Sequence, residues 1–486
     1  MKLHAFIAGL AALACLPNAH AVYVSPDGRG QALIYPYYTA QGNNDTLFSI
    51  VSPISYGGSS APRKAVKVRF FEGRNGRSVL EFNLYLARGK TWTAAVTRDA
   101  TGRPVLRTFD PACTVPRFGP SSVYPAATEI AFTNANYAGY DRAGSSLDRA
   151  KEGHFEVIEM GEIDAGFLLN SGVSLVDAIT PGSLQDCAAV AAAWNAGGAF
   201  LSSGGAELTA PSTEPSYMLL GHALIINVPQ GTEYSYDPVA LGRLFAAKRH
   251  TGPGDAHPNL GDADPTSLVL ANGISRQSTW STGIDAVSAV LTHKKIINEY
   301  VGPPTATAPV SSDVIVSFPT KSFYVVRESD AGQTTRAPFR VKFDDLDDVN
   351  GTLLAEGMSK GACEQLWSLR FSRAGTPNFD TVFMRPADTL FLCWQTSVIS
   401  FGNVLDSANA ILYSGVLPAY TTSGTINVTL DSPDLSFPFL TSLEGHIYPG
   451  LPVAGFAMQR RINGDLGGVR ANYGGTSMHK YETGLE

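Results

Sequence analysis

The sequence has few charged residues and no cluster of basic ones. Charged residues make up 16% of the 486 residues, and the formal net charge is −7. No block of five or more like charges occurs in the chain. Because proteins that bind nucleic acids neutralise phosphates with clustered Lys and Arg side chains, we expect no nucleic-acid partner.

Long hydrophobic runs are missing beyond the N-terminus. A transmembrane helix needs about 20 mostly apolar residues. No segment after the first 21 residues approaches that length. We therefore expect no transmembrane segment.

The first 21 residues have the pattern of a cleavable signal peptide. Lys2 is followed by an almost wholly apolar run over residues 5–16, and the small residues Ala19 and Ala21 flank His20. Cleavage between Ala21 and Val22 would leave 465 of the 486 residues. The pattern predicts an exported protein that works outside the cytoplasm. A lipoprotein modified at Cys15 is the alternative, with a poorer motif.

Cysteine is also scarce, and its use agrees with export. Four cysteines remain once the leader is removed: Cys113, Cys187, Cys363 and Cys393. Three pairings are possible, and chain order favours disulfides between Cys113 and Cys187 and between Cys363 and Cys393. Four buried free thiols are the alternative. No CxxC motif occurs, so the spacing supports neither a zinc site nor thiol-redox chemistry.

Alternating apolar and polar residues predict a mainly β fold. The clearest segment is 65–86, where Val66 and Val68 alternate with Lys67, and Asn75-Gly76 marks a tight turn. It predicts a hairpin with one solvated face. Further strand patterns cover 31–38, 46–52, 91–97, 313–318, 338–343, 365–371, 389–394, 411–416 and 425–430. Their spacing favours an antiparallel β-sandwich architecture.

A few helices are expected as insertions in this β scaffold. Ser183 can cap a helix over 184–194, and Asp237-Pro238 can open a second over 239–250. A third is expected over 284–300. The segment 301–312, VGPPTATAPVSS, reads as a linker because paired prolines continue neither helix nor sheet.

Two domains follow from that linker. We expect a β-sandwich domain with helical insertions over 22–300 and a second β-rich domain over 313–486. A single domain in which 301–312 is only a long connection is the alternative.

The densest charge in the chain is the acidic run 344–351, DDLDDVNG. It resembles part of a calcium loop, so Asp345, Asp347 and Asp348 are our candidate ligands for calcium. The regular spacing of the aspartates is out of phase, and the expected bidentate glutamate is missing. A hairpin tip with solvated aspartates, turning at Asn350-Gly351, is the preferred interpretation.

Two other sets of possible metal ligands are less specific. The Gly/Pro-rich segment 250–264 contains five such residues: His250, Asp255, His257, Asp262 and Asp264. We interpret this segment as a solvated surface loop. His154 and Glu156 share one face of a predicted strand and could bind a metal, although such pairs usually form the polar side of a half-buried strand.

No catalytic constellation is convincing. Ser359 lies in a G-x-S-x-G pattern, but no strong preceding strand or alternating βαβ series gives that motif its hydrolase context. We therefore expect a protein that is not an enzyme. The alternative is a secreted carbohydrate-binding protein or hydrolase, in which Trp92, Trp280, Trp367 and Trp394 stack on sugar rings.

Several segments are familiar as a set. They are QALIYPYYT (31–39), KAVKVRFFEGRNGRSVLEFNLYL (64–86), INVPQGTEYSYD (226–237), IINEYVG (296–302), VSFPTKSFYV (316–325) and GLPVAGFAMQRRINGDLGGVRANYGG (450–475). Together they resemble an exported proteobacterial family described as cell-surface or surface-layer proteins. The resemblance implies a non-catalytic structural protein that self-associates into a surface layer or biofilm matrix and contacts other cell-surface components. It also implies calcium as a candidate cofactor, because surface-layer proteins often need calcium for assembly.

Overall fold

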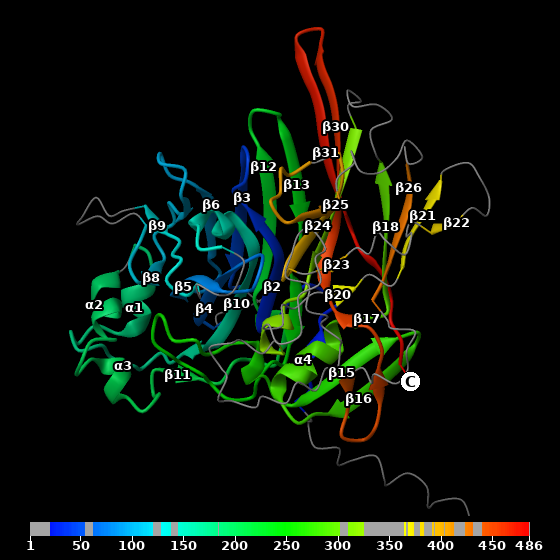
Figure 1. The fold of residues 1–486 in the computed structure, drawn as a ribbon. Helices are drawn as coiled ribbons and strands as arrows, with labels where there is room; N and C mark the ends of the chain where they lie inside the picture. The colour runs from blue at the N-terminus through cyan, green and yellow to red at the C-terminus, as the bar shows by residue number, and fades with distance from the viewer. Residues whose placement is uncertain are drawn as a thin grey trace, which may run out of the picture.

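The chain folds into antiparallel β-sheets with few helices, which confirms the predicted fold class (Figure 1). The computed structural model describes residues 20–53, 62–119, 128–137, 144–182, 184–301, 310–324, 364–365, 368–373, 380–382, 391–392, 394–402, 404–412, 423–430 and 440–485. Within these ranges, every pairing between named strands is antiparallel except that of β24 with β25.

The first layer is an eight-stranded sheet, called here the large sheet. Its path runs β1 (Tyr23–Val24), β14 (Val239–Gly242), β2 (Ala32–Thr39), β10 (Glu152–Ile163), β4 (Lys64–Glu72), β5 (Ser78–Leu86) and β8 (Cys113–Val115), and β11 (Leu208–Thr209) pairs with β10. The predicted hairpin is present as β4 and β5, with Gly76 in the turn at φ +63°. Such a positive φ is the conformation that glycine adopts at little cost.

The second layer is a six-stranded sheet that faces the large sheet. Its order is β13 (Thr232–Tyr236), β12 (Leu220–Asn227), β3 (Asn44–Val51), β6 (Thr91–Arg98), β7 (Pro104–Arg107) and β9 (Glu129–Ala131). Aromatic side chains fill the space between the layers; Phe48 and Phe70 lie with their ring centroids 5.9 Å apart. Trp92 also packs in this core and is fully buried.

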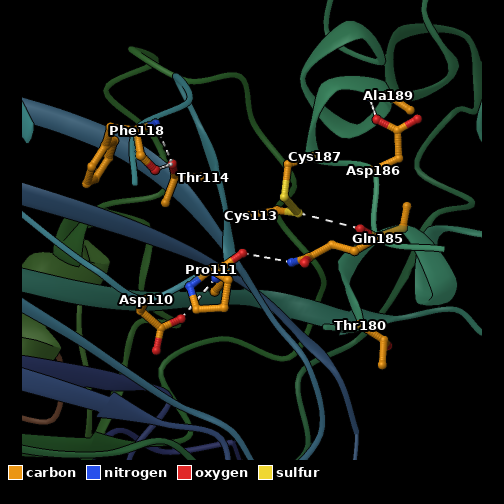
Figure 2. The surroundings of a disulfide bond; sticks show 12 residues. Asp110, Pro111, Cys113, Thr114, Phe118, Thr180, Gln185, Asp186, Cys187 and Ala189 are labelled. Atoms are coloured by element: carbon orange, nitrogen blue, oxygen red, sulfur yellow. Dashed lines mark hydrogen bonds between the residues drawn. A yellow bond between two sulfur atoms is a disulfide. The ribbon is translucent and has the colours of Figure 1, made fainter. Parts of the chain in front are cut away.

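Three short helices lie beside one end of the large sheet and form a core of their own with it. They are α1 (Leu175–Ile179), α2 (Cys187–Ala192) and α3 (Ala199–Ser202). A disulfide joins Cys113 in β8 to Cys187 at the start of α2, with a Cα–Cα distance of 5.0 Å (Figure 2). This confirms one predicted pair. Cys363 and Cys393 lie outside the described residues.

A further apolar cluster covers the other end of the large sheet. It contains α4 (Gly283–Leu291) and part of the hairpin of β15 (Thr266–Ala271) with β16 (Ile274–Thr279). Val22, the predicted first residue after cleavage, is buried in this cluster, and its N–H donates to Thr266 O at 2.8 Å. Ala21, on the other side of the predicted cleavage bond, is also buried.

The C-terminal half forms two five-stranded sheets around a separate core. One sheet has the order β22 (Asp380–Val382), β21 (Ser368–Arg373), β26 (Ser423–Thr429), β18 (Lys295–Val301) and β32 (Lys480–Glu482). The other has the order β25 (Ala410–Leu412), β24 (Thr396–Phe401), β19 (Val310–Ser317), β30 (Ala454–Leu466) and β31 (Val469–Met478).

Small elements complete the described part of the chain. The two-stranded pairs are β17 (Thr292–His293) with β29 (Leu451–Pro452), β20 (Glu364–Gln365) with β23 (Phe391–Leu392), and β27 (Leu440–Thr441) with β28 (Ile447–Tyr448). The 3₁₀ turns are Leu147–Lys151, Pro215–Tyr217, Leu260–Asp262 and Lys321–Phe323. Over the ranges that the structure describes, no helix is both long and apolar enough to cross a membrane.

The two halves of the chain make direct non-covalent contacts with each other, in addition to their covalent connection. Phe456 of β30 stacks on Tyr236 of β13 with ring centroids 4.3 Å apart, and both rings belong to the core of the first sandwich. The carboxylate of Glu152 in β10 accepts bonds from Ser407 Oγ at 2.7 Å and Asn409 N at 3.1 Å. Strand β18, which precedes the predicted linker, pairs with β26 of the C-terminal half. The division into domains over 22–300 and 313–486 stays a prediction.

Three local predictions were wrong. The helix expected over 239–250 is absent because residues 239–242 form β14, which lies between β1 and β2. The helix expected over 284–300 ends at Leu291, since 295–301 alternates as strand β18. The helix expected over 184–194 is the shorter α2. At the linker, residues 310–312 already belong to β19, and 302–309 lie outside the described ranges.

Candidate functional site

The outer face of the large sheet carries charged side chains that are buried. Val66, Val68 and Phe70 of β4 point into the sandwich, and Lys67 and Arg69 point away from it. We predicted that this face would be solvated, but Lys67 is 0% and Arg69 6% exposed. The prediction was wrong because a later segment covers the face.

The covering segment is the Gly/Pro-rich loop near residue 252. Lys67 Nζ donates to Gly252 O at 2.5 Å, and Asn83 Nδ2 donates to Thr251 O at 2.8 Å. These bonds hold the loop against the sheet. The alternating pattern of β4 gives no sign of this cover, because the loop lies more than a hundred residues further along the chain.

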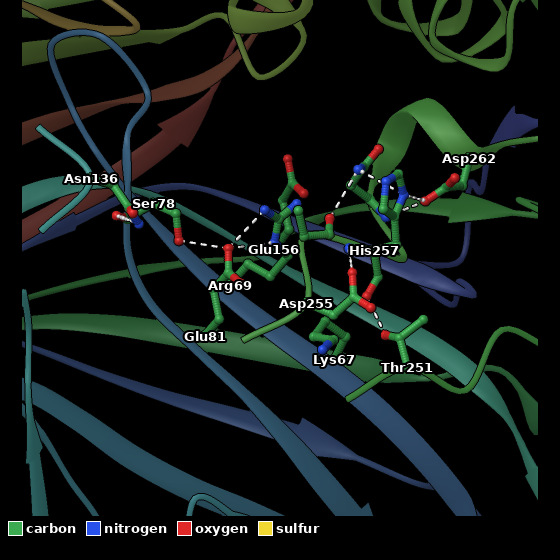
Figure 3. Close-up of polar contacts among 12 residues, drawn as sticks. Lys67, Arg69, Ser78, Glu81, Asn136, Glu156, Thr251, Asp255, His257 and Asp262 are labelled. Carbon is green, nitrogen blue, oxygen red and sulfur yellow. Dashed lines mark hydrogen bonds and ion pairs between the residues drawn. The ribbon is translucent and has the colours of Figure 1, made fainter. Parts of the chain in front are cut away.

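A polar cavity of about 420 Å³ lies where this cover is incomplete. We call it the sheet cavity; Figure 3 shows the polar contacts of Arg69, Ser78 and Glu81, with Glu156 beside them. Its floor is the outer face of β4, β5 and β10, with Arg69, Glu81, His154 and Glu156. Its rim is supplied by the turn before β5, the loop over 254–259 and the segment 319–323. The rim reaches solvent, since Phe323 is 37% exposed.

Arg69 and Glu81 form a compensated pair in this cavity. Arg69 Nε and Nη2 both donate to Glu81 Oε1, at 3.1 Å and 2.8 Å. Ser78 Oγ donates to the same oxygen at 2.7 Å. The two side chains are only 8% and 12% exposed, so their charges largely neutralise each other in a poorly solvated place.

His154 and Glu156 lie next to this pair and have fewer hydrogen-bond partners. Both side chains are almost fully buried, and His154 Nε2 is 3.9 Å from Glu156 Oε1, beyond hydrogen-bond distance. His154 Nδ1 and Glu156 Oε2 have no hydrogen-bond partner within the described structure. The His154 ring stacks on Phe71 with centroids 4.9 Å apart, which fixes the plane of the imidazole.

Burial sets the protonation of these two groups. It raises the pKa of Glu156 to about 7, although the nearby Arg69 charge acts in the opposite direction. Burial, together with Arg69, lowers the pKa of His154 to about 3. At neutral pH the imidazole is therefore uncharged, and a large fraction of the carboxyl groups carries a proton. Both groups can then donate and accept hydrogen bonds.

The candidate metal ligands in the loop 250–264 are not arranged around a common site. His250 is buried, and its ring bonds to Glu207 Oε1 at 2.7 Å and to Tyr85 OH at 3.0 Å. His257 instead bonds to Asp262 at 2.7 Å within the loop. Across the described ranges, no group of three or more His, Cys, Asp or Glu side chains is arranged to hold a metal ion.

The His250 network shows what the sequence could not reveal. Glu207 also accepts from Ser203 Oγ, and Trp194 Nε1 donates to Tyr85 OH at 2.9 Å. These residues come from three separate segments, so no spacing rule brings them together. The polar groups bond mainly to one another, and the network fixes the helical segment to β5.

Several predicted site residues fall outside the described ranges. They are the calcium candidates Asp345, Asp347 and Asp348, together with Ser359, Cys363, Cys393 and Trp367. Calcium binding and the second disulfide stay predictions. Two tryptophans offered for sugar stacking are buried instead: Trp92 is 0% and Trp280 3% exposed. Those two cannot serve as a stacking surface.

A second hollow lies on the solvent-facing side of the six-stranded sheet. It has a volume of about 400 Å³ and is lined by Leu47, Ala95 and Leu224, among others. Phe109 stands at this hollow with 74% of its surface exposed. We call it the apolar groove. Its residue types reveal little, because isolated exposed apolar residues are common on proteins.

The stretch of the β30–β31 hairpin from its turn to the middle of β31 carries exposed apolar side chains. Figure 1 shows this hairpin extending beyond the neighbouring strands. Val469 is 68% exposed and Tyr473 60% exposed, although both belong to strand β31. We call this stretch the hairpin tip.

In comparisons with known proteins, no family model, curated protein or solved structure matches the chain.

Proposed function

We propose that the protein is a non-catalytic structural protein of the bacterial cell surface that self-associates into a surface layer or matrix. The observation that carries the proposal is that the hairpin tip and the apolar groove lie on different parts of one chain. A protrusion of one copy that fits a hollow of the next makes a head-to-tail contact. Such a contact repeats without closing and builds an extended assembly.

Three further features support this proposal. The leader pattern predicts export, and the Cys113–Cys187 disulfide suits an oxidising compartment. The resemblance to exported cell-surface proteins covers nearly the whole mature sequence.

The occupant of the groove is, in this proposal, the hairpin tip of another copy. Val469 and Tyr473 at the tip are apolar and exposed, and so is Phe109 at the groove. Burial of such side chains stabilises association in proportion to the apolar area removed from water. Neither surface needs a metal or a catalytic group.

Mixing two variants of the mature protein tests the head-to-tail contact. One variant, Val469→Asp with Tyr473→Ser, damages only the tip; the other, Phe109→Ser, damages only the groove. Light scattering coupled to size-exclusion chromatography should find that each variant alone is monomeric and that the wild type forms large particles. Their mixture should stop at dimers, because each copy then keeps one intact surface.

The control is Leu184→Ser, which removes an equally exposed leucine beside the helices. It should assemble like the wild type. All samples are measured with calcium and with a chelator, which also tests the predicted calcium requirement. A wild type that stays monomeric at every concentration in both buffers would overturn the proposal, as would equal effects of all three variants.

Localisation is tested separately. Intact cells that express the native protein should release it into the wash on treatment with chelator or mild acid, detected by immunoblot of the wash and the cell pellet. A protein found only in the cytoplasmic fraction would contradict the cell-surface part of the proposal.

A further inference from the structure

The sheet cavity has the properties of a ligand site. His154 and Glu156 line its floor, and both side chains are at least 98% buried. His154 Nδ1 and Glu156 Oε2 have no hydrogen-bond partner in the described structure. Buried polar atoms in folded proteins are almost always paired, so two adjacent unpaired ones call for an external partner. A ligand that enters from the rim can supply it.

We propose that the sheet cavity binds one neutral polyhydroxylated unit, such as a single sugar ring, through His154 and Glu156. The proposal is independent of self-association, because a monomer presents the same cavity. Either proposal can therefore fail while the other stands.

The charges around the cavity favour a neutral ligand. Two guanidinium groups, of Arg69 and Arg77, and two carboxyl groups, of Glu81 and Glu156, line it. Arg69 is already engaged by Glu81 at 2.8 Å. His154 is uncharged near neutral pH and a large fraction of Glu156 carries a proton, so neither offers a full charge to pair with an ion in this poorly solvated site.

The chemistry of the floor favours hydroxyl groups in particular. A neutral imidazole has one donor and one acceptor nitrogen, and a carboxyl group donates or accepts according to its protonation. A hydroxyl group can do both, so neighbouring hydroxyls on one ring can satisfy His154 Nδ1 and Glu156 Oε2 together. The volume of about 420 Å³ lies within the range of small-molecule sites.

An aromatic side chain provides the apolar surface that a sugar ring needs. The Phe71 ring at the floor is already contacted by the His154 ring and by the Arg69 guanidinium, which lies 4.9 Å from its centroid. Phe323 at the rim is the aromatic residue that a ligand can contact. The C–H face of a pyranose can pack on such a ring, while its hydroxyls bond to the polar groups. This combination differs from the tryptophan surface expected from the sequence.

Isothermal titration calorimetry on the mature wild-type protein tests the proposal. The neutral probes are D-glucose, D-galactose and N-acetyl-D-glucosamine; the charged probes are D-glucuronate and D-glucosamine. We expect at least one neutral sugar to bind, and its charged analogue to bind at least about tenfold more weakly. Glu156→Leu should weaken the neutral sugar about tenfold or more, since it leaves a ligand hydroxyl unpaired.

Three further variants test whether a change in binding is specific to the cavity. Glu156→Gln keeps a donor and an acceptor and should retain binding within a few fold. Phe323→Ser changes a rim residue that is 37% exposed and should weaken binding. Glu129→Leu, on the other sheet, removes a carboxylate far from the cavity in the chain and should have no effect.

Three results would overturn the proposal. One is the absence of heat, and of ligand-observed NMR signals, with all the neutral probes. Another is tighter binding of a charged probe than of its neutral analogue. The last is binding of a neutral sugar that neither Glu156→Leu nor Phe323→Ser weakens, because the sugar would then bind elsewhere.

Discussion

Glu156 is held in the large sheet with a carboxyl group that is difficult to ionise. Its pKa is raised to about 7 by burial, from the ordinary value of 4.5. Between these two pH values the folded protein binds a proton that the unfolded chain has released. Stability contributed by this group is therefore present below about pH 4.5 and is lost as the pH rises through about 7.

The variant Glu156→Gln should remove this loss. Glutamine resembles the protonated carboxyl group but does not ionise. The free energy of unfolding of the variant should therefore increase relative to that of the wild type as the pH rises. Between pH 4.5 and pH 8 the gain should be about 3 kcal/mol, from the size of the shift. Urea denaturation at a series of pH values measures it.

His154 makes the stability depend on pH in the opposite direction, but it does not affect the comparison of the variant with the wild type. Its lowered pKa means that the unfolded chain gains a proton first, so stability falls as the pH decreases below about 6.5. This effect is present in both proteins and cancels in their difference. The wild type, measured over the same pH range, is the reference. A difference for Glu156→Gln that does not change with pH would mean that Glu156 ionises normally.

At the scale of elements, the Cys113–Cys187 disulfide connects β8 to α2 across 74 residues. A cross-link over a loop of that length stabilises the folded protein by about 4 kcal/mol in the loop-entropy model. The double variant Cys113→Ala, Cys187→Ala should therefore unfold at a lower urea concentration, with the helical segment 164–202 the first to become sensitive to protease.

The second predicted pair gives the matched comparison. Cys363→Ala with Cys393→Ala should leave the protease sensitivity of 164–202 unchanged, and non-reducing peptide mapping of the wild type should detect both disulfides. Equal stability of the Cys113→Ala, Cys187→Ala variant and the wild type would show that the helical segment is held by its apolar core and the His250 network alone.

Strands were easier to predict than helices, for a physical reason. The alternation of Val66, Lys67 and Val68 is a local pattern with a period of two, and the strand exists as expected. The segment 239–250 is composed of good helix formers, yet 239–242 pairs with β1 and β2. A Cβ atom at Gly242 would lie 2.4 Å from the ring of Tyr23, a close approach that only the tertiary structure explains.

The candidate site was only partly predictable. His154 and Glu156 were placed on one strand face from their spacing, and the structure puts them side by side at the floor of the sheet cavity. Glu81 and the rim residue Phe323 could not be associated with them, because they come from segments far apart in the sequence. Burial of the pair depends on the loop near residue 252, which composition alone suggested to be solvated.

At the scale of the whole molecule, the halves share buried surface. Phe456 and Met458 of β30 belong to the same core as Phe48 and Phe70 of the first sandwich. Asn44 Nδ2 donates to Leu405 O at 2.9 Å, and the buried carboxylate of Glu152 accepts from residues 407–409. These contacts predict that each half depends on the other for its stability, whether or not residues 301–312 act as a linker.

Cutting that connection tests this dependence. A protease site inserted within 302–309 allows the folded protein to be cleaved once between β18 and β19. We expect the two fragments to remain together in size-exclusion chromatography and to separate only in denaturant. Separation would expose Phe456 and Tyr236 to water and remove the hydrogen bonds that residues 407–409 donate to the Glu152 carboxyl group. Both losses cost free energy, which is why the pieces should not part spontaneously. The uncut protein, carrying the same insertion, is the control for unfolding in urea. Two fragments that elute separately as folded monomers would instead establish the independent domains over 22–300 and 313–486 that the linker composition predicts.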